Sequence, residues 1–81
     1  MANRKAYVLI QVHPGKVEEV VRSIRGKPGI LAADTVAGPH DIIAVLQGSD
    51  ADSIARIVVN EIQAIGGIQH TITYMAINDK G

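Results

Sequence analysis

Apolar positions along the chain change period four times, and these changes predict its elements. Residues 5–13 are rich in β-branched and aliphatic side chains on both parities, which predicts a strand covered on both faces. Residues 15–25 repeat valine and isoleucine at helical spacing, with acidic and basic residues between them, so they predict an amphipathic helix. Two further strands are predicted over residues 30–37 and 41–47. They are joined by the turn Gly38-Pro39-His40-Asp41.

A second helix is predicted after the loop Gly48-Ser49-Asp50. Ser49 and Asp52 have the spacing of a capping box, so Ser49 is the expected N-cap. The apolar stripe of this helix consists of Ile54, Ile57, Val58, Ile62 and Ile65. Gly66-Gly67 ends the helix, and residues 68–77 predict the last strand.

The predicted order is therefore βαββαβ, with polar, mobile tails at residues 1–4 and 78–81 around one domain at residues 5–77. Right-handed crossovers favour one topology for this order, the ferredoxin-like α+β fold: a four-stranded antiparallel sheet of order 4-1-3-2 with both helices on one face. Apolar residues on both parities of the first and third strands then leave the second face of the sheet without a cover. We expect another copy to cover it, sheet against sheet, in an obligate dimer of the dimeric α+β barrel type.

Composition narrows the classes of partner. The 81 residues carry 8 basic and 8 acidic side chains, and a formal charge of zero gives no field to hold a nucleic acid. No run approaches the roughly 20 apolar residues that span a bilayer. The chain has no cysteine, which fits a reducing compartment, and we expect a cytoplasmic protein.

Three histidines raise the question of a metal site. We expect His13 and His70 to lie at one edge of the sheet and His40 at the opposite edge, which would exclude a site built from all three. A metal site made by His13 and His70 remains an alternative. The favoured interpretation is that both are exposed histidines at strand ends, so no metal site is predicted.

Catalytic chemistry finds no support in the sequence. There is no cysteine nucleophile, and Ser23 and Ser49 have no His-Asp pair at a useful spacing. Gly66-Gly67 is not part of a phosphate-binding pattern. We therefore expect no enzyme and no cofactor.

The turn Gly38-Pro39-His40-Asp41 is the remaining candidate for polar chemistry. We expect it to lie at the edge where the last strand ends, near Tyr74, Met75 and Ala76. Backbone N–H groups of a tight turn can bind an anion and the carboxylate of Asp41 a cation, which suits the two charges of an amino acid. The alternative is that Gly38 and Pro39 only make the turn and Asp41 only caps it.

Several motifs carry a family resemblance when taken in order. They are Pro14-Gly15-Lys16, Pro28-Gly29-Ile30, Val36-Ala37-Gly38-Pro39-His40-Asp41-Ile42-Ile43, Gly66-Gly67-Ile68 and Thr71-Ile72-Thr73-Tyr74. Together they resemble the effector-binding domain of the Lrp/AsnC family, the feast/famine regulators, over about residues 5–77.

The resemblance implies dimers that assemble into octamer or decamer rings, with an amino-acid effector in clefts where dimers meet. Asp41 would take the ammonium group, and N–H groups near Gly38 and His40 or a threonine hydroxyl would take the carboxylate. Pro39 has no N–H group to contribute. The binding residues implied by the resemblance are Gly38, Pro39, His40, Asp41, Thr71, Thr73, Tyr74, Met75 and Ala76.

Family members usually place a helix-turn-helix domain before this one, whereas here the first strand begins within a few residues of Met1. We therefore expect a stand-alone effector-binding and oligomerisation module that acts on transcription indirectly, with a full-length Lrp/AsnC regulator as a possible partner. Two other functions stay open. One is a dimeric α+β barrel enzyme, and the other is a purely structural assembly partner.

Overall fold

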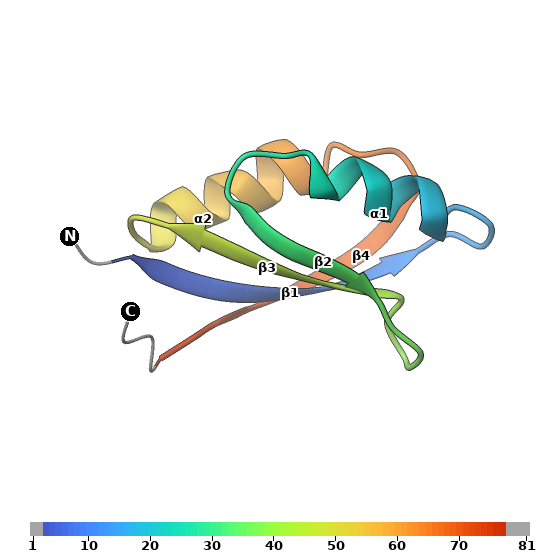
Figure 1. The fold of residues 1–81 in the computed structure, drawn as a ribbon, viewed down its shortest axis with the longest axis horizontal. Coiled ribbons are helices and arrows are strands. Elements are labelled where there is room, and N and C mark those ends of the chain that lie inside the picture. The colour runs from blue at the N-terminus through green and yellow to red at the C-terminus, as the bar shows by residue number, and fades with distance from the viewer. Residues whose placement is uncertain (1–2, 78–81) are drawn as a thin grey trace.

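The computed structural model describes residues 3–77 and contains the six expected elements in the expected order (Figure 1). Their bounds are β1 Arg4–Val12, α1 Val17–Arg25, β2 Ile30–Thr35, β3 Ile42–Gly48, α2 Ala51–Ile57 with its continuation η1 Val58–Ile62, and β4 Ile68–Met75. The expected tail at residues 78–81 lies outside the described residues, as do residues 1–2. Within the described part of the chain, no helix is long and apolar enough to cross a membrane.

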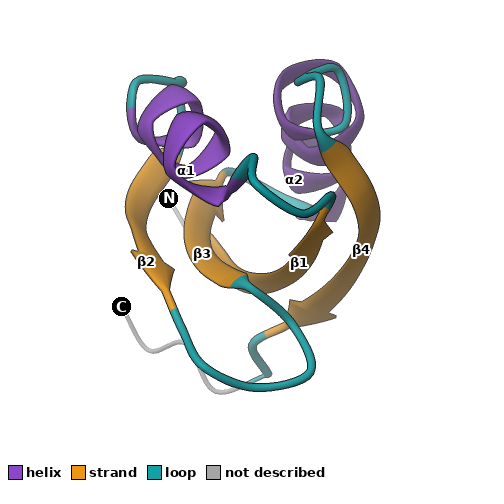
Figure 2. Ribbon diagram, turned by 90° about the vertical axis from the view of Figure 1, so that its right-hand side faces the viewer, coloured by secondary structure: helices purple, strands orange, loops and turns teal. Residues whose placement is uncertain are grey.

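The four strands form one antiparallel sheet of order β2-β3-β1-β4, which confirms the predicted topology. Both helices lie on the same side of this sheet, α1 over β2 and β3 and α2 over β1 and β3 (Figures 1 and 2). This arrangement follows from two βαβ crossovers of the same hand. The fold is ferredoxin-like.

The core is aliphatic and fills the space between the sheet and the helices. Alternate residues of β1 and β3 point toward the helices and are buried, because successive side chains of a strand face opposite sides. The core includes Val8, Ile10, Ile42, Leu46, Val20, Ile24, Ile54 and Ile62. No polar or charged residue is buried among residues 3–77, so any polar chemistry of this domain lies at its surface.

The N-cap of α2 is Asp50, not Ser49 as expected. Asp50 Oδ1 accepts hydrogen bonds from the backbone N–H of Ser53 at 2.8 Å and from the Ser53 hydroxyl at 2.9 Å. These two bonds favour the ionised carboxylate and lower the pKa of Asp50. Ser49 Oγ lies 3.0 Å from Ser53 Oγ and so joins the same cluster as a side-chain partner.

The second helix widens into a π-helical turn over η1, which the sequence did not predict. Its buried residues Ile54, Val58 and Ile62 recur every four positions. Positions i, i+4 and i+8 also share one face of a regular α-helix, so this spacing does not distinguish the two kinds of helix. All three side chains are buried in the core.

The other face of the sheet, which we call the open face, is apolar and carries no helix. Paired residues on adjacent strands point to the same side, so two cross-strand rows run over it. In one row Tyr7 lies between Tyr74 and Val45. In the other, Leu9 lies between Ile72 and Ile43. Tyr7 is 39% exposed and Tyr74 56%, which leaves large apolar side chains in solvent in the single chain.

Candidate functional site

The turn between β2 and β3 lies at the end of the sheet where β1 ends and β4 begins. This position corrects the expectation that it lies beside the end of β4. β3 and β4 are both antiparallel to β1, so both begin beside the end of β1. Ile42 at the start of β3 pairs with Ile10, and Ile68 at the start of β4 pairs with Val12. The turn therefore shares its end of the molecule with the first residues of β4.

Three hydrogen bonds made by Asp41 fix the turn. Its carbonyl accepts the N–H of Val36 across the turn at 2.9 Å, and its own N–H donates to the carbonyl of Ile10 at 2.9 Å. Its side-chain Oδ2 accepts the N–H of Val12 at 2.8 Å. β1 shifts register against β4 between Gln11 and Val12, and the Asp41 carboxylate satisfies the Val12 N–H beside this irregularity. Asp41 thus has the structural role of a cap.

Oδ1 of Asp41 accepts no hydrogen bond from a described residue. The carboxylate therefore has one oxygen committed to β1 and one that can face a cation. Gly38 lies in a bend where an added Cβ would meet nothing within 4 Å, so its surroundings are open. Pro39 offers no N–H group. One oxygen of Asp41 is thus left without a hydrogen-bond donor among residues 3–77, and His40 and Gly38 are the residues of the turn whose N–H groups donate to no backbone carbonyl there.

His40 and His70 lie side by side, which corrects the expectation that they occupy opposite edges. Their ring centroids are 6.4 Å apart and their planes differ by 24°. Gln11 pairs with His70, so the start of β4 brings both side chains to the open face near the turn. Residues 3–77 contain no group of three or more histidine, cysteine, aspartate or glutamate side chains able to hold a metal ion.

Most of the β4 residues expected at the site lie elsewhere. Tyr74 pairs with Tyr7, Met75 pairs with Ala6, and the Ala76 N–H donates to the Lys5 carbonyl at 2.9 Å, all toward the opposite end of β1. Thr73 and Met75 face the helices and line a small apolar groove of about 180 Å³ beside α2.

Thr71 is closer to the turn because it pairs with Ile10, but its hydroxyl faces the helix side and accepts a hydrogen bond from Gln63 Nε2 at 3.0 Å. The structure brings His40 and Asp41 together with His70 and Gln11 instead. The antiparallel register alone would have identified this pairing, since it follows from the direction of β3 and β4 relative to β1.

The fold and this surface define a class of protein, a small ferredoxin-like domain with an apolar open face and a polar turn at one end of its sheet. Residues 5–80 match the family described as the Lrp/AsnC ligand binding domain. The chain belongs to the Lrp/AsnC family.

Relatives and solved structures agree with this assignment. An uncharacterised HTH-type transcriptional regulator of Pyrococcus horikoshii, PH1916, is 31% identical over 74 residues, which are 88% of this chain and 49% of that protein. The chain thus spans about half the length of the curated relatives it matches. The crystal structure of PHS023 from Pyrococcus horikoshii has a TM-score of 0.85 at 25% identity, with 95% of this chain and 93% of that chain covered.

The fold extends to more distant structures. AsnC of E. coli has a TM-score of 0.88 at 17% identity, over 95% of this chain and 52% of that chain. The transcriptional regulator NMB0573 of Neisseria meningitidis, solved as a complex with L-Met, has a TM-score of 0.83 at 15% identity, over 96% of this chain and 52% of that chain. At these identities the likeness shows the fold alone.

Proposed function

We propose that this domain binds an amino-acid effector, assembles through its open sheet face, and acts on transcription through a partner without contacting DNA itself. Membership of the Lrp/AsnC ligand-binding family is the observation that carries the proposal. A regulator of the same fold has been solved with L-Met, and curated relatives are named as HTH-type transcriptional regulators. Ligand binding, not catalysis, is therefore the activity we propose.

The turn is the proposed effector site. The free Oδ1 of Asp41 would bind the ammonium group of the effector, and the N–H groups of His40 and Gly38 would bind its carboxylate. The imidazole of His70, 6.4 Å from that of His40, would form one wall of the site. Because the turn is tied to β1 by its own hydrogen bonds, it would be organised before the effector arrives.

The remaining candidate residues would come from a neighbouring subunit. Thr73, Tyr74, Met75 and Ala76 lie toward the far end of β4 and do not reach the turn of their own chain. We propose that a second copy supplies them, so that the effector binds between subunits. In that case binding and assembly are coupled, because an effector that contacts two subunits stabilises their association.

The open face is the proposed surface of dimerisation. Its two rows place Tyr74, Tyr7 and Val45 beside Ile72, Leu9 and Ile43 in one continuous apolar area. A chain of 81 residues has a small core and therefore little stability to offset the cost of exposing such an apolar area to water. A second copy offers the same face by symmetry, so two sheets can cover one another.

Isothermal titration with each common amino acid tests the effector site. Asp41→Asn is the sharpest variant, since its amide oxygen can still accept the Val12 N–H while the negative charge is removed. Asp52→Asn is the matched control, because it removes an equal charge in the first turn of α2, away from the turn.

We expect at least one amino acid to bind the native chain and the Asp52→Asn variant equally. Binding to Asp41→Asn should be weaker by about tenfold, the loss of one charge-assisted contact. Equal binding by all three proteins would show that Asp41 is not part of the site. No binding by any amino acid would refute the proposed function.

A further inference from the structure

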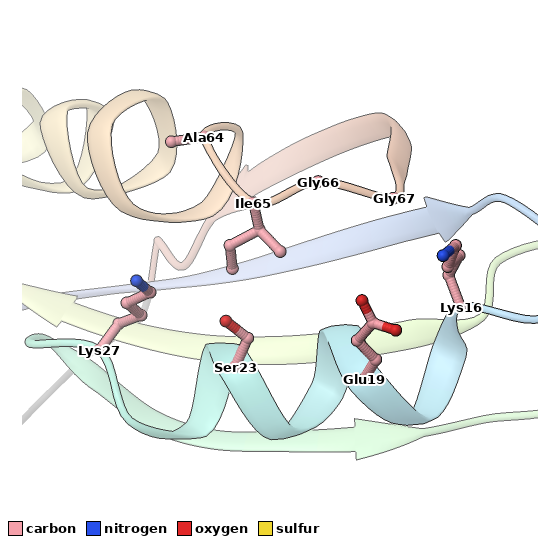
Figure 3. A pocket seen from close by; sticks show the side chains of 8 residues that line it. All are labelled: Lys16, Glu19, Ser23, Lys27, Ala64, Ile65, Gly66 and Gly67. Atoms are coloured by element: carbon pink, nitrogen blue, oxygen red, sulfur yellow. The ribbon is translucent and has the colours of Figure 1, made fainter.

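A second surface site lies on the helix side of the sheet, away from the open face. It is a groove of about 480 Å³ between α1 and the segment of residues 64–67 that leads into β4. Figure 3 shows the side chains that line it. This volume falls in the range of small-molecule sites, which is about 300–1,000 Å³.

One wall of the groove is a polar stripe of α1 and its flanks. Lys16, Glu19, Ser23 and Lys27 line the groove at spacings of three and four residues, the spacing of one helix face. Figure 3 shows all four side chains pointing toward the segment of residues 64–67. The four side chains therefore line one side of the groove, with Lys16 and Glu19 exposed and Ser23 and Lys27 half-buried.

The charges of this stripe alternate and are free. In chain order they are positive at Lys16, negative at Glu19 and positive at Lys27, a net charge of +1. The ion pair found among residues 3–77 joins Glu18 to Arg22 at 3.6 Å, on another face of α1. None of the three charges in the groove has an ion-pair partner in the described part of the chain.

The opposite wall consists of backbone and one apolar side chain. Ile65 packs against the core. A Cβ at Gly67 would lie 3.1 Å from Val20 Cγ2 and 3.2 Å from Lys16 Cβ, and its φ of +102° is a conformation that favours glycine. A Cβ at Gly66 would meet nothing within 4 Å, so the groove is open above it.

The glycines also leave hydrogen-bond donors at this wall. The backbone N–H groups of Gly66 and Gly67 donate to no backbone carbonyl within residues 3–77, whereas the Gly67 carbonyl accepts the N–H of His13 at 2.8 Å. Two amide donors are thus available beside two lysines and one serine hydroxyl, a set that suits carboxylate oxygens.

We propose that this groove binds an acidic amino acid, a ligand with two carboxylates and one ammonium group. The ligand carries charges of negative, positive and negative sign, which complement Lys16, Glu19 and Lys27, and its net charge of −1 complements that of the groove. Ser23 and the glycine N–H groups would complete the contacts to the carboxylates. This site is separate from the turn around Asp41 and does not depend on it.

The distance between the two lysines is compatible with a ligand that contacts both of them. Lys16 and Lys27 are eleven positions apart, which corresponds to about 16 Å along a helix axis. Their four-carbon stems are flexible, so both ammonium groups can approach a ligand near Glu19 and Ser23. A neutral amino acid would leave one lysine without a partner, and a ligand without an ammonium group would place its charge against Glu19 with no compensation. The groove thus discriminates by charge pattern.

Amide NMR of the labelled full chain, titrated with L-glutamate and separately with L-glutamine, tests the proposal. Lys27→Gln removes one carboxylate partner in the groove. Arg22→Gln is the matched control, since it removes one positive charge from α1 outside the groove. The Asp41→Asn variant distinguishes binding in the groove from binding at the turn, because it changes the turn alone.

We expect glutamate to shift the amide signals of Ser23, Gly66 and Gly67, and to bind about tenfold more tightly than glutamine. The Lys27→Gln variant should bind glutamate about tenfold more weakly, while Arg22→Gln and Asp41→Asn should bind it as the native chain does.

Three results would overturn the inference: no glutamate binding, equal affinity in Lys27→Gln, or equal shifts from glutamine. A fourth is glutamate shifts confined to the turn, which Asp41→Asn abolishes and Lys27→Gln does not; that result would leave the proposed effector site standing.

Discussion

Replacing Asp41 by alanine removes the acceptor of the Val12 N–H at the end of β1. The bond is 2.8 Å long and its donor belongs to a residue that is only 5% exposed, so the N–H would be left without a partner close to the core. A hydrogen bond to a charged acceptor contributes about 1.5–3 kcal/mol, and we expect the free energy of unfolding to fall by about 2 kcal/mol.

Asp41→Asn provides the internal comparison. Its amide oxygen can keep the bond to Val12 without the charge, so the expected loss is about 1 kcal/mol. Urea unfolding followed by far-UV circular dichroism measures both variants. Protein concentration must be equal throughout, because the stability of an oligomer depends on it.

With a slope of about 1 kcal/mol per molar urea, the midpoint should fall by about 2 M for alanine and about 1 M for asparagine. A midpoint for Asp41→Ala equal to that of the native chain would refute the reasoning that this carboxylate organises the turn. Equal losses in both variants would show that its charge matters and its hydrogen bond does not.

The remaining predictions concern a glycine, a helix cap and the open face. Gly29→Ala should lower stability by about 2 kcal/mol in urea unfolding, because φ is +82° and the new Cβ would lie 2.5 Å from Ile57 Cδ1; an unchanged midpoint would contradict this. The pKa of Asp50 is lowered, so its cap stabilises α2 at neutral pH, and this contribution is lost as the pH falls through that pKa. Asp50→Ala should therefore lower the melting temperature at pH 7 and leave it unchanged at a pH well below the pKa of Asp50. A loss of equal size at both pH values would argue against the cap. Ile72→Lys should convert the proposed dimer to monomer in sedimentation equilibrium, whereas Val59→Lys, at a site 56% exposed on η1, should leave the mass unchanged; a dimeric Ile72→Lys would exclude the open face as the interface.

Local patterns were enough to predict the elements and the topology. The period of the apolar residues distinguished four strands from two helices, and the handedness of crossovers then allowed one sheet order, which the structure confirms. The N-cap residue of α2 could not be assigned from the sequence, because Ser49 and Asp50 are adjacent and both residue types favour the N-cap position. Asp50 takes that position, with Ser53 three residues later.

The π-helical turn could not be predicted from period alone. The spacing of Ile54, Val58 and Ile62 is that of an ordinary α-helical stripe, so the sequence does not distinguish the wider turn from a regular α-helix. The candidate site was half predicted. The turn and Asp41 were identified by residue type, but the neighbours of the turn depend on strand direction, and the expected placement of His40 and of Tyr74 was wrong for that reason.

The helix-side groove depends on tertiary structure. Glu19 is exposed on α1, and the second helix ends at Ile62, before the Gly66-Gly67 pair that was expected to end it. Only the packing of residues 64–67 beside α1 brings their polar groups to a common space. A pattern within one helix carries no information about the segment that faces it.

The central claim is that an amino acid binds at the turn. Amide NMR of the labelled protein, titrated with the neutral amino acids, tests it most directly, since these lack the second carboxylate that the groove requires. We expect at least one of them to shift the signals of Gly38, His40 and His70, and Asp41→Asn to suppress the shifts. Binding with shifts only at other positions, or no shift from any of them, would contradict the account.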